Sequence, residues 1–505
     1  MSSNALRRGR TLAPHARPSA RAGLVAVMRA CVALVVGMIA ATNLAVPLLA
    51  AGELHPSASA LIWIVDMYVI FFACLVIPGG AAGDRFGRKG VLLAGLGLFA
   101  AGALVSAGAP TVVVLLVGRA ITGVGAAAVL PNTLAVLLHA VPADRRAATI
   151  ATWASMSGLG GVIGNIGGGA ILSSGSWRWL FLAAVPLTLA LLALSALIAP
   201  VSPRHARRID PLGTLLLVGA SVALLLGIVE GPEAGWGSVP VISGFVCAAV
   251  LFVAWTVVEL KVEHPLLDPR LFRLPRLRGA CLGMTTVFFG MFALFYVNAS
   301  FLQYAKGFGV LSTGLGIVPL TIPMLFGPRY VGGLVARIGL DATVASAFVL
   351  IGGGLLGLST SGARTPYLCY AAWLVVLGIG LTLALPSLSG AIASALPPAQ
   401  AGVGAGLQAT TREFGSALGV AVIGTVLTAR FAAALPPDIR AEHDPHTVAE
   451  ALAATTDARS GDVVAAFVSS ADLGLWVIGV AVLGLGALVV LESLLSRRAR
   501  ADADM

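Results

Sequence analysis

Residues 79–90 read GGAAGDRFGRKG and form a short charged segment between two apolar runs, 61–80 and 91–107. The segment is too short to be a domain, and it is rich in glycine and in basic side chains. Basic residues beside apolar runs are typical of loops on the cytoplasmic side of a membrane. The pattern therefore predicts a cytoplasmic turn between two membrane-spanning helices.

The composition indicates the class of protein. Of 505 residues, 58% are hydrophobic and 11% are charged, which is more apolar surface than a soluble domain of this size needs. The net charge of +10 would suggest nucleic-acid binding in a soluble protein. Here the basic residues gather in alternate loops, which indicates orientation in a membrane instead, so we expect no nucleic-acid partner. None of the five cysteines forms a C-x-x-C pair, and we expect no metal site.

Apolar runs long enough to span a bilayer follow one another along the chain. The expected spans are 30–50, 58–80, 90–108, 111–134, 148–172, 178–199, 211–230, 239–259, 279–303, 312–335, 341–360, 366–390, 402–429 and 472–495. An even number of spans places both termini on one side, and Lys and Arg concentrate in the loops predicted on that side. We therefore predict an all-α membrane protein with 14 transmembrane helices and both termini in the cytoplasm.

A second segment repeats the charged turn. Residues 332–341, GGLVARIGLD, align with residues 80–89, although Ala336 replaces Asp84. The matching pairs are Gly332 with Gly80, Arg337 with Arg85 and Gly339 with Gly87. The repeat predicts two related six-helix bundles. The expected parts are a basic cytoplasmic tail (1–29), the first bundle (30–200), a linker with two additional transmembrane helices (201–259), a cytoplasmic segment (260–278), the second bundle (279–495) with an outer loop (431–471), and a cytoplasmic tail (496–505).

Several motifs resemble the major facilitator superfamily. The turn G-x-x-G-D-R-x-G-R-K is similar to the loop between helices 2 and 3 of that family. Further stretches resemble, in the same order, the family's fourteen-helix drug:proton antiporter branch: 43–47 (NLAVP), 63–68 (WIVDMY), 119–127 (RAITGVGAA), 176–181 (SWRWLF) and 411–421 (TREFGSALGVA). The resemblance implies export of drugs or antibiotics in exchange for protons by alternating access. It also implies that the proton gradient supplies the energy and that no cofactor is needed.

Two positions depart from the pattern of that branch. Met38 stands where the branch usually has an acid in its first helix, and Asn165 replaces the proline of the helix-5 motif. The glycines of this motif, Gly160, Gly164 and Gly168, are kept. They predict close helix packing, whereas the bend that the proline would cause is left open.

Ionisable side chains inside a bilayer are costly and therefore mark candidate functional sites. Asp66 and Arg119 each lie about eight residues, roughly 12 Å, into a span from the outer side. We expect a pair in which Asp66 takes up and releases a proton while Arg119 biases its pKa. The alternative is a static ion pair that ties two helices together. Glu413 is a second candidate for proton coupling, and we expect its neighbour Arg412 to point in a different direction.

The charged turn is predicted to act in gating. We expect Asp84 and Arg85 to form a charge latch that holds the turn against the opposite bundle in one state. The gating set is Gly80, Gly83, Asp84, Arg85, Gly87 and Arg88. Polar, basic and aromatic residues within the spans form a candidate substrate cavity. The alternatives are interhelical hydrogen bonds for the polar residues, snorkelling to the interface for Arg329, and a lipid- or core-facing position for the aromatic residues. The cavity set is Asn43, Trp63, Tyr68, Gln303, Arg329 and Arg412.

We therefore expect a multi-pass transporter of the plasma membrane that works as a monomer and exports a small amphipathic molecule, a drug or an antibiotic. The alternative is a transporter of the same fold for a nutrient or a cell-made metabolite. The sequence has no Walker, HExxH or GxSxG motif, so neither an enzyme nor ATP-driven transport by this chain is expected. A membrane receptor is also less expected than a transporter.

Overall fold

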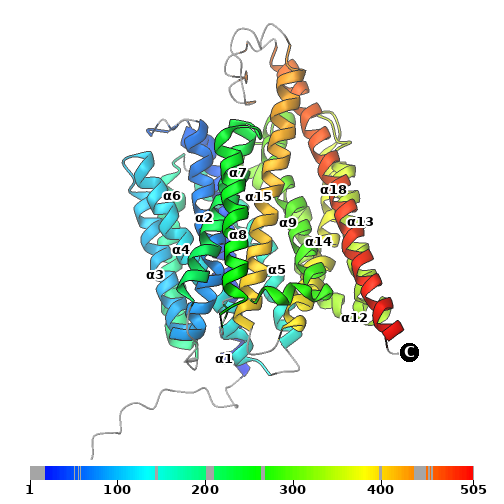
Figure 1. Cartoon of the computed structure of the whole chain (residues 1–505). Helices are drawn as coiled ribbons and strands as arrows, with labels where there is room; N and C mark the ends of the chain where they lie inside the picture. Colours follow the sequence, from blue (N-terminus) through cyan, green and yellow to red (C-terminus); the bar gives the residue numbers. More distant parts are fainter. Residues whose placement is uncertain are drawn as a thin grey trace, which may run out of the picture.

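The computed structural model of the chain describes residues 18–503 apart from 51, 55, 57, 143–145, 174, 201–209, 263–264, 266–267, 397–400, 437–447, 449–450, 453–454 and 456–458. Within this part every regular element is a helix, and most of the helices stand side by side (Figure 1). Twelve of them are long and apolar enough to cross a membrane, or up to 13 if a bent pair counts as one span. The all-helical membrane class is confirmed, whereas the count of 14 and the side of the termini stay predictions.

The first bundle consists of six helices in chain order. They are α1 (Pro18–Ala50), α2 (Ala58–Phe86), α3 (Arg88–Ala107), α4 (Val112–Ala140), α5 (Arg146–Leu172) and α6 (Arg178–Ile198). α1 begins inside the predicted tail 1–29. A search for apolar runs detects only the part of a helix that crosses the bilayer and misses a polar extension of the same helix. Residues 1–17 lie outside the described part of the chain.

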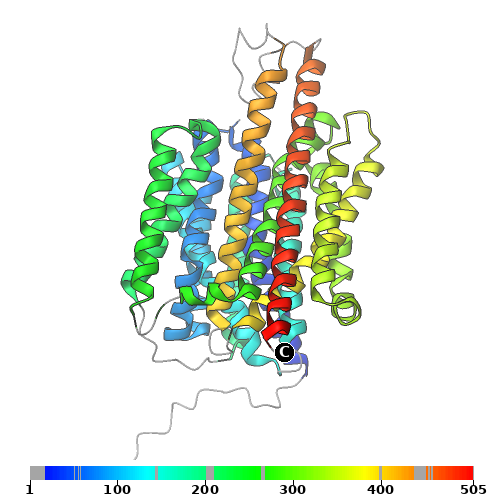
Figure 2. The same cartoon turned by 45° about the vertical axis from the view of Figure 1, so that its right-hand side comes forward.

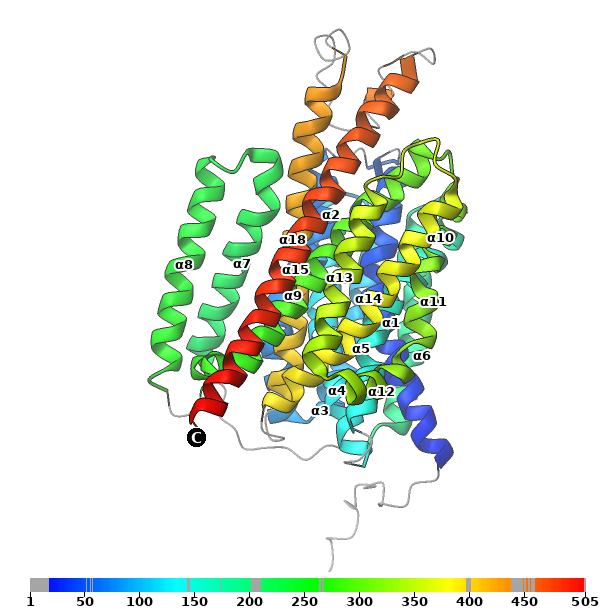
Figure 3. The same ribbon diagram turned by 90° about the vertical axis from the view of Figure 1, so that its right-hand side faces the viewer.

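A hairpin of α7 (Pro211–Ala234) and α8 (Val239–Glu259) follows the first bundle. α7 packs against both α2 and α15, whereas α8 packs mainly on α7. Figure 3 shows α8 at the outer edge of the molecule. The hairpin therefore touches both bundles mainly through α7.

The second bundle begins after a short 3₁₀ helix at Pro269–Arg273. Its elements are α9 (Pro275–Ser300), the π-helix η3 (Phe301–Ala305), α10 (Val310–Leu315), α11 (Val318–Phe326), α12 (Pro328–Ile338), α13 (Leu340–Leu358), α14 (Tyr367–Ala395), α15 (Ala401–Ala434) and α18 (Ser460–Ala503). α15 and α18, orange and red in Figure 2, extend past the other helices at one end. They reach into the predicted outer loop 431–471, part of which lies outside the described residues, and α18 also continues through most of the predicted tail 496–505.

The predicted repeat has the same backbone geometry in both bundles. Gly87 and Gly339 lie between consecutive helices with positive φ angles of 101° and 85°, which glycine adopts without steric cost. The amide of Gly87 donates to Gly83 O, and the amide of Gly339 donates to Val335 O in the same relation. The two turns are thus structural equivalents.

The helices that lead into the two turns differ. α2 is a single helix up to Phe86, although Pro78 lies inside it. The corresponding part of the second bundle is broken, because the segments Leu311–Phe326 and Pro328–Ile338 meet at a bend of 58°. Gly327 and Pro328 explain the break, since proline lacks the amide that would continue the helix.

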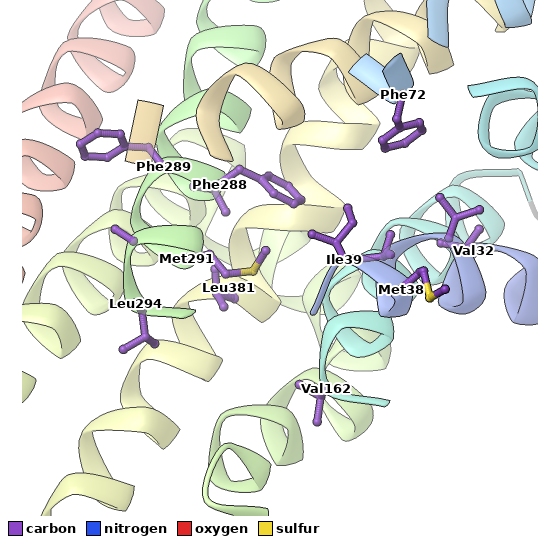
Figure 4. Packing of buried hydrophobic residues seen from close by; sticks show 14 of the residues in the cluster. Val32, Met38, Ile39, Phe72, Val162, Phe288, Phe289, Met291, Leu294 and Leu381 are labelled. Carbon is purple, nitrogen blue, oxygen red and sulfur yellow. The ribbon is translucent and has the colours of Figure 1, made fainter. Parts of the chain in front are cut away.

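The two bundles meet along two lines of contact. α2 packs against α15, and α5 packs against α10, α11 and α14. Apolar side chains of both bundles lie between these lines, with Ile39 and Val162 from the first bundle and Phe288, Met291 and Leu381 from the second (Figure 4). Met38, where the related branch usually has an acid, is buried in the same apolar core.

Candidate functional site

Arg119 of α4 is completely buried and reaches across to α2. Its Nε donates to Ile64 O at 2.8 Å, and its Nη2 donates to Val65 O at 3.3 Å. Its guanidinium lies 4.7 Å from the centre of the Tyr68 ring. The Nη1 atom has no hydrogen-bond partner among the described residues. A buried cation with an unsatisfied donor is costly, so this position favours an acceptor.

Asp66 lies next to the two carbonyls that Arg119 contacts. Its side chain is half-buried, and its carboxylate is close enough to attract the Arg119 guanidinium electrostatically. The structure thus brings the predicted Asp66 and Arg119 into one neighbourhood. The hydrogen bonds of Arg119 nevertheless go to the backbone of α2, so this arginine also fixes α2 to α4.

Arg412 and Glu413 of α15 form a buried ion pair. The Nε and Nη2 atoms of Arg412 both lie 2.8 Å from Glu413 Oε1, and the residues are 4% and 1% exposed. The expectation that these neighbours diverge is wrong, because the long arginine side chain folds back toward the carboxylate. Glu413 Oε2 has no hydrogen-bond partner in the described part of the chain. One carboxylate oxygen therefore remains to accept a proton.

Tyr68 lies at the centre of these charges. Its hydroxyl donates to Val35 O of α1 at 2.8 Å, and it lies within electrostatic reach of Arg119, Arg412 and Glu413. Because the side chain is completely buried, Tyr68 does not line an open cavity as predicted. It instead ties α2 to α1 through its hydroxyl and packs its ring against Arg119 of α4.

Two aromatic rings complete the site at the contact between α2 and α15. The Arg412 guanidinium lies 5.3 Å from the ring of Phe72 and 5.7 Å from the ring of Phe288. Phe72 belongs to α2 and Phe288 to α9, and Figure 4 shows both rings projecting into the region between the bundles. Cation–π contacts therefore link Arg412 to both bundles.

The other predicted cavity residues lie on separate elements. Asn43 is exposed and donates to Ile39 O within its own helix, Gln303 lies half-buried in the π-helix, and Arg329 is exposed on α12. Trp63 packs beside an apolar cluster between α2, α7 and α15. The contacts of these residues do not assemble them into one set.

The charged turn fastens α2 and α3 to neighbours in the first bundle. Asp84 is buried and pairs with Arg88 at 3.0 Å, and Arg88 also donates to Ala135 O of α4. Lys89 donates to the carbonyls of Ala196 and Ala199 at the end of α6, both at 2.7 Å. Arg85 is exposed. These bonds lie within one bundle, so the latch toward the opposite bundle stays a prediction.

Gly83 of the same turn packs against α4. A Cβ atom there would lie 2.7 Å from Asn132 Cγ, so the Asn132 side chain occupies the space that a larger residue would need. Asn132 donates in turn to Gly79 O at 3.1 Å. The turn is thus positioned by glycine contacts as well as by charge.

The helix-5 glycines face α1. A Cβ on Gly160 would lie 3.0 Å from Ala33 Cα, and a Cβ on Gly168 would lie 2.8 Å from Ala41 Cβ. Gly164 lies directly against Gly37. Asn165 is half-buried, and α5 continues through it as one helix. Its backbone carbonyl contacts Gly314 of α10, so this motif packs on both bundles.

One acid of α18 was missed by the sequence analysis. Asp472 is half-buried, and its Oδ1 has no hydrogen-bond partner within the described ranges. The predicted last span began at this residue, which made it a helix end. Extending that span toward the N-terminus through the apolar residues before Asp472 would have placed the acid inside it.

Known proteins resemble this chain in sequence and in fold. The family model described as Major Facilitator Superfamily matches residues 28–420. The multidrug resistance protein Stp of Mycobacterium tuberculosis is 32% identical over 404 residues, which cover 79% of this chain and 75% of Stp. The tetracenomycin C resistance and export protein of Streptomyces glaucescens is 30% identical over 410 residues, which cover 80% and 76%. Among solved structures, the POT family transporter PepTSo has a TM-score of 0.64 at 13% identity and covers 95% of this chain and 99% of its own.

Proposed function

Because the chain belongs to the Major Facilitator Superfamily, we propose that it exports amphipathic drugs or antibiotics in exchange for protons. It is a multi-pass transporter of the plasma membrane and not an enzyme. The observation that carries the proposal is the buried charged group around Tyr68, to which both bundles contribute. Buried charges inside a membrane protein are retained at a cost in stability, which is the mark of a proton or ion pathway.

Proton coupling is assigned to Asp66, Arg119 and Glu413. When Asp66 is ionised, its carboxylate is attracted by Arg119; when it is protonated, that attraction is lost and the α2–α4 contact weakens. On the other bundle, ionised Glu413 attracts Arg412 in the same way, and protonation of Glu413 removes that attraction. Proton uptake at Asp66 therefore changes the attraction between α2 and α4, and proton uptake at Glu413 changes the charge balance of Arg412, whose ring contacts with Phe72 and Phe288 link the two bundles. Both changes act on helices that form the contact between the bundles, which alternating access requires to open and close.

The substrate-binding site is assigned to the apolar region between the bundles. Phe288, Met291 and Leu381 lie opposite Ile39 there (Figure 4). Flexible methionine side chains and aromatic rings suit varied apolar ligands. Nearby arginines donate hydrogen bonds to carbonyl or hydroxyl oxygens of a ligand and accept none. The names of the relatives support the same class, since Stp is a multidrug resistance protein and the Streptomyces relative is a resistance and export protein.

Exchange of Asp66 for asparagine tests the coupling. The Asp66→Asn variant is expected to lose proton-driven export, because an amide cannot take up the transported proton, while its amount in the membrane stays unchanged. Substrate-induced proton flux in everted vesicles and drug resistance of a sensitive host are the measurements. The matched control is Asp462→Asn at the exposed start of α18. Full proton-coupled export by the Asp66 variant would remove this residue from the pathway.

The gating assignment of Asp84 leads to a different expectation. In Asp84→Asn the acceptor oxygen stays but its charge is lost, which weakens a charged hydrogen bond with Arg88 worth about 1.5–3 kcal/mol, so the export rate should fall on the order of tenfold. The set of competing substrates should stay the same, because the turn lies at the ends of α2 and α3, away from Phe288 and Met291. Initial rates and competition in vesicles measure both. A changed competition profile contradicts a gating role.

Export of a product made by the cell itself is the second candidate. The observation that favours it is the tetracenomycin C relative, whose name combines resistance with export. Met38 and Asn165 also differ from the pattern of the drug:proton branch. Deleting the gene and measuring which of the cell's own compounds accumulate inside separates this function from broad drug export.

A further inference from the structure

α12 presents an exposed basic face outside the proposed transport site. Val331 is buried, whereas Arg329, Tyr330, Gly333 and Arg337 are exposed. Positions four apart lie on one side of a helix, so Arg329 and Arg337 flank Gly333. A Cβ on Gly333 would meet no atom within 4 Å. The two arginines therefore border an open surface rather than a packed one.

The bend before α12 places this face near the end of the bundle. Leu311–Phe326 rises about 24 Å at 1.5 Å per residue, close to the roughly 30 Å of a hydrocarbon core. The chain then turns by 58°, and the span α13 begins just after α12, at Leu340. Figures 1 and 3 show α12 at the same end of the molecule as the C-terminal end of α18. These facts locate α12 at the surface of the bilayer.

The chemistry of the face fits an anion at that depth. The Arg329 guanidinium lies 4.8 Å from the centre of the Tyr330 ring, and tyrosine is favoured at the membrane–water boundary. α12 has no acidic residue, and Asp341 in the first turn of α13 accepts a hydrogen bond from Ser493. Arginine forks donate two parallel bonds to a phosphate.

We propose that the α12 face formed by Arg329, Tyr330, Gly333 and Arg337 binds the phosphate headgroup of an anionic phospholipid. The lipid tails lie along the apolar end of α11, where Ile322, Leu325 and Phe326 are exposed. Met324 of α11 contacts the position of Gly158 in α5, so a lipid held by α12 also steadies the contact between the bundles.

Retention of lipid by the purified full-length protein tests the proposal without any transport assay. The protein is extracted from bilayers of phosphatidylglycerol and phosphatidylcholine, and the retained lipids are measured by mass spectrometry. Basic residues near an anionic surface contribute about 1 kcal/mol each, so Arg329→Gln and Arg337→Gln should each lower the retained phosphatidylglycerol about fivefold. The control Arg364→Gln, an exposed arginine in the loop between α13 and α14, should retain it like the wild type.

Further measurements decide whether the ligand is a lipid or a free anion and whether Arg329 belongs to the lipid site or to the substrate cavity. Arg329→Lys with Arg337→Lys should keep most of the retained lipid, and Gly333→Leu should lower it by filling the open surface. If the variant that combines Arg329→Gln with Arg337→Gln retains as much phosphatidylglycerol as the wild type, the proposal is overturned. Displacement of the lipid by inorganic phosphate alone would identify a free-anion site instead, and a changed substrate competition in Arg329→Gln would place this arginine in the substrate cavity.

Discussion

The Glu413→Ala variant is expected to unfold at a markedly lower temperature than the wild type. Removing one partner of a buried ion pair costs about 3–5 kcal/mol, because the remaining charge stays in apolar surroundings. Here the remaining charge is Arg412, which is 4% exposed and lies between the rings of Phe72 and Phe288. Thermal unfolding in detergent, followed by size-exclusion chromatography, measures the loss.

A double variant separates charge balance from function. Arg412→Met with Glu413→Leu removes both charges, and replacing a buried pair by apolar residues is often neutral, so much of the stability should return. Export should not return, because no proton acceptor remains on α15. Glu413→Gln provides the third point of the comparison, since it keeps the shape of the side chain and loses its charge. A stable and fully active Glu413→Ala protein contradicts both the energetic role and the coupling role of this acid.

The Gly164→Ala variant is expected to assemble poorly. The added methyl group would overlap the backbone of Gly37, where α1 and α5 come closest. Overpacking of a tight core costs about 1–3 kcal/mol, and a backbone atom cannot rotate away as a side chain can. The amount of monodisperse protein and its thermal stability are the measurements.

Gly167 supplies a matched control on the same helix. A Cβ there meets nothing within 4 Å, and alanine is about 1 kcal/mol better than glycine in a helix. Gly167→Ala should therefore be neutral or slightly stabilising. If both variants behave alike, the close approach of α1 and α5 does not limit the packing of the first bundle.

The sequence predicted the helical fold better than the contacts of its charged residues. Apolar runs locate helices because the bilayer demands about 20 apolar residues for each span, and the repeated turn at Gly87 and Gly339 was visible from glycine and arginine alone. Helix ends were placed less well, since α15 and α18 continue beyond their apolar parts. The bend at Gly327 was not predicted, because the apolar run 312–335 continues through Pro328 and hydropathy does not register a missing backbone amide.

Side-chain geometry explains the differences at the candidate site. Helical periodicity assigns Arg412 and Glu413 to different directions, but it does not describe how far an arginine can fold back to a neighbour. Depth along the helices correctly suggested that Asp66 and Arg119 lie near one another. It did not reveal that Arg119 bonds the carbonyls of Ile64 and Val65, because backbone acceptors have no signature in the sequence. Tyr68 was assigned to the cavity for its aromatic ring, and its burial depends on neighbouring helices, among them α1 and α4.

The position of α7 has a consequence for how molecules reach the protein from the lipid phase. α7 covers the contact between α2 and α15, where Leu225 packs on Ile70, Ala73 and Cys74. Amphipathic compounds concentrate within the bilayer, and at the α2–α15 contact α7 lies between them and the two bundles. The other line of contact, between α5 and the broken helix α10–α11, has no such cover from the hairpin. A compound that approaches the α2–α15 contact from the bilayer therefore meets α7 first, so α7 shields one of the two lines along which the bundles touch.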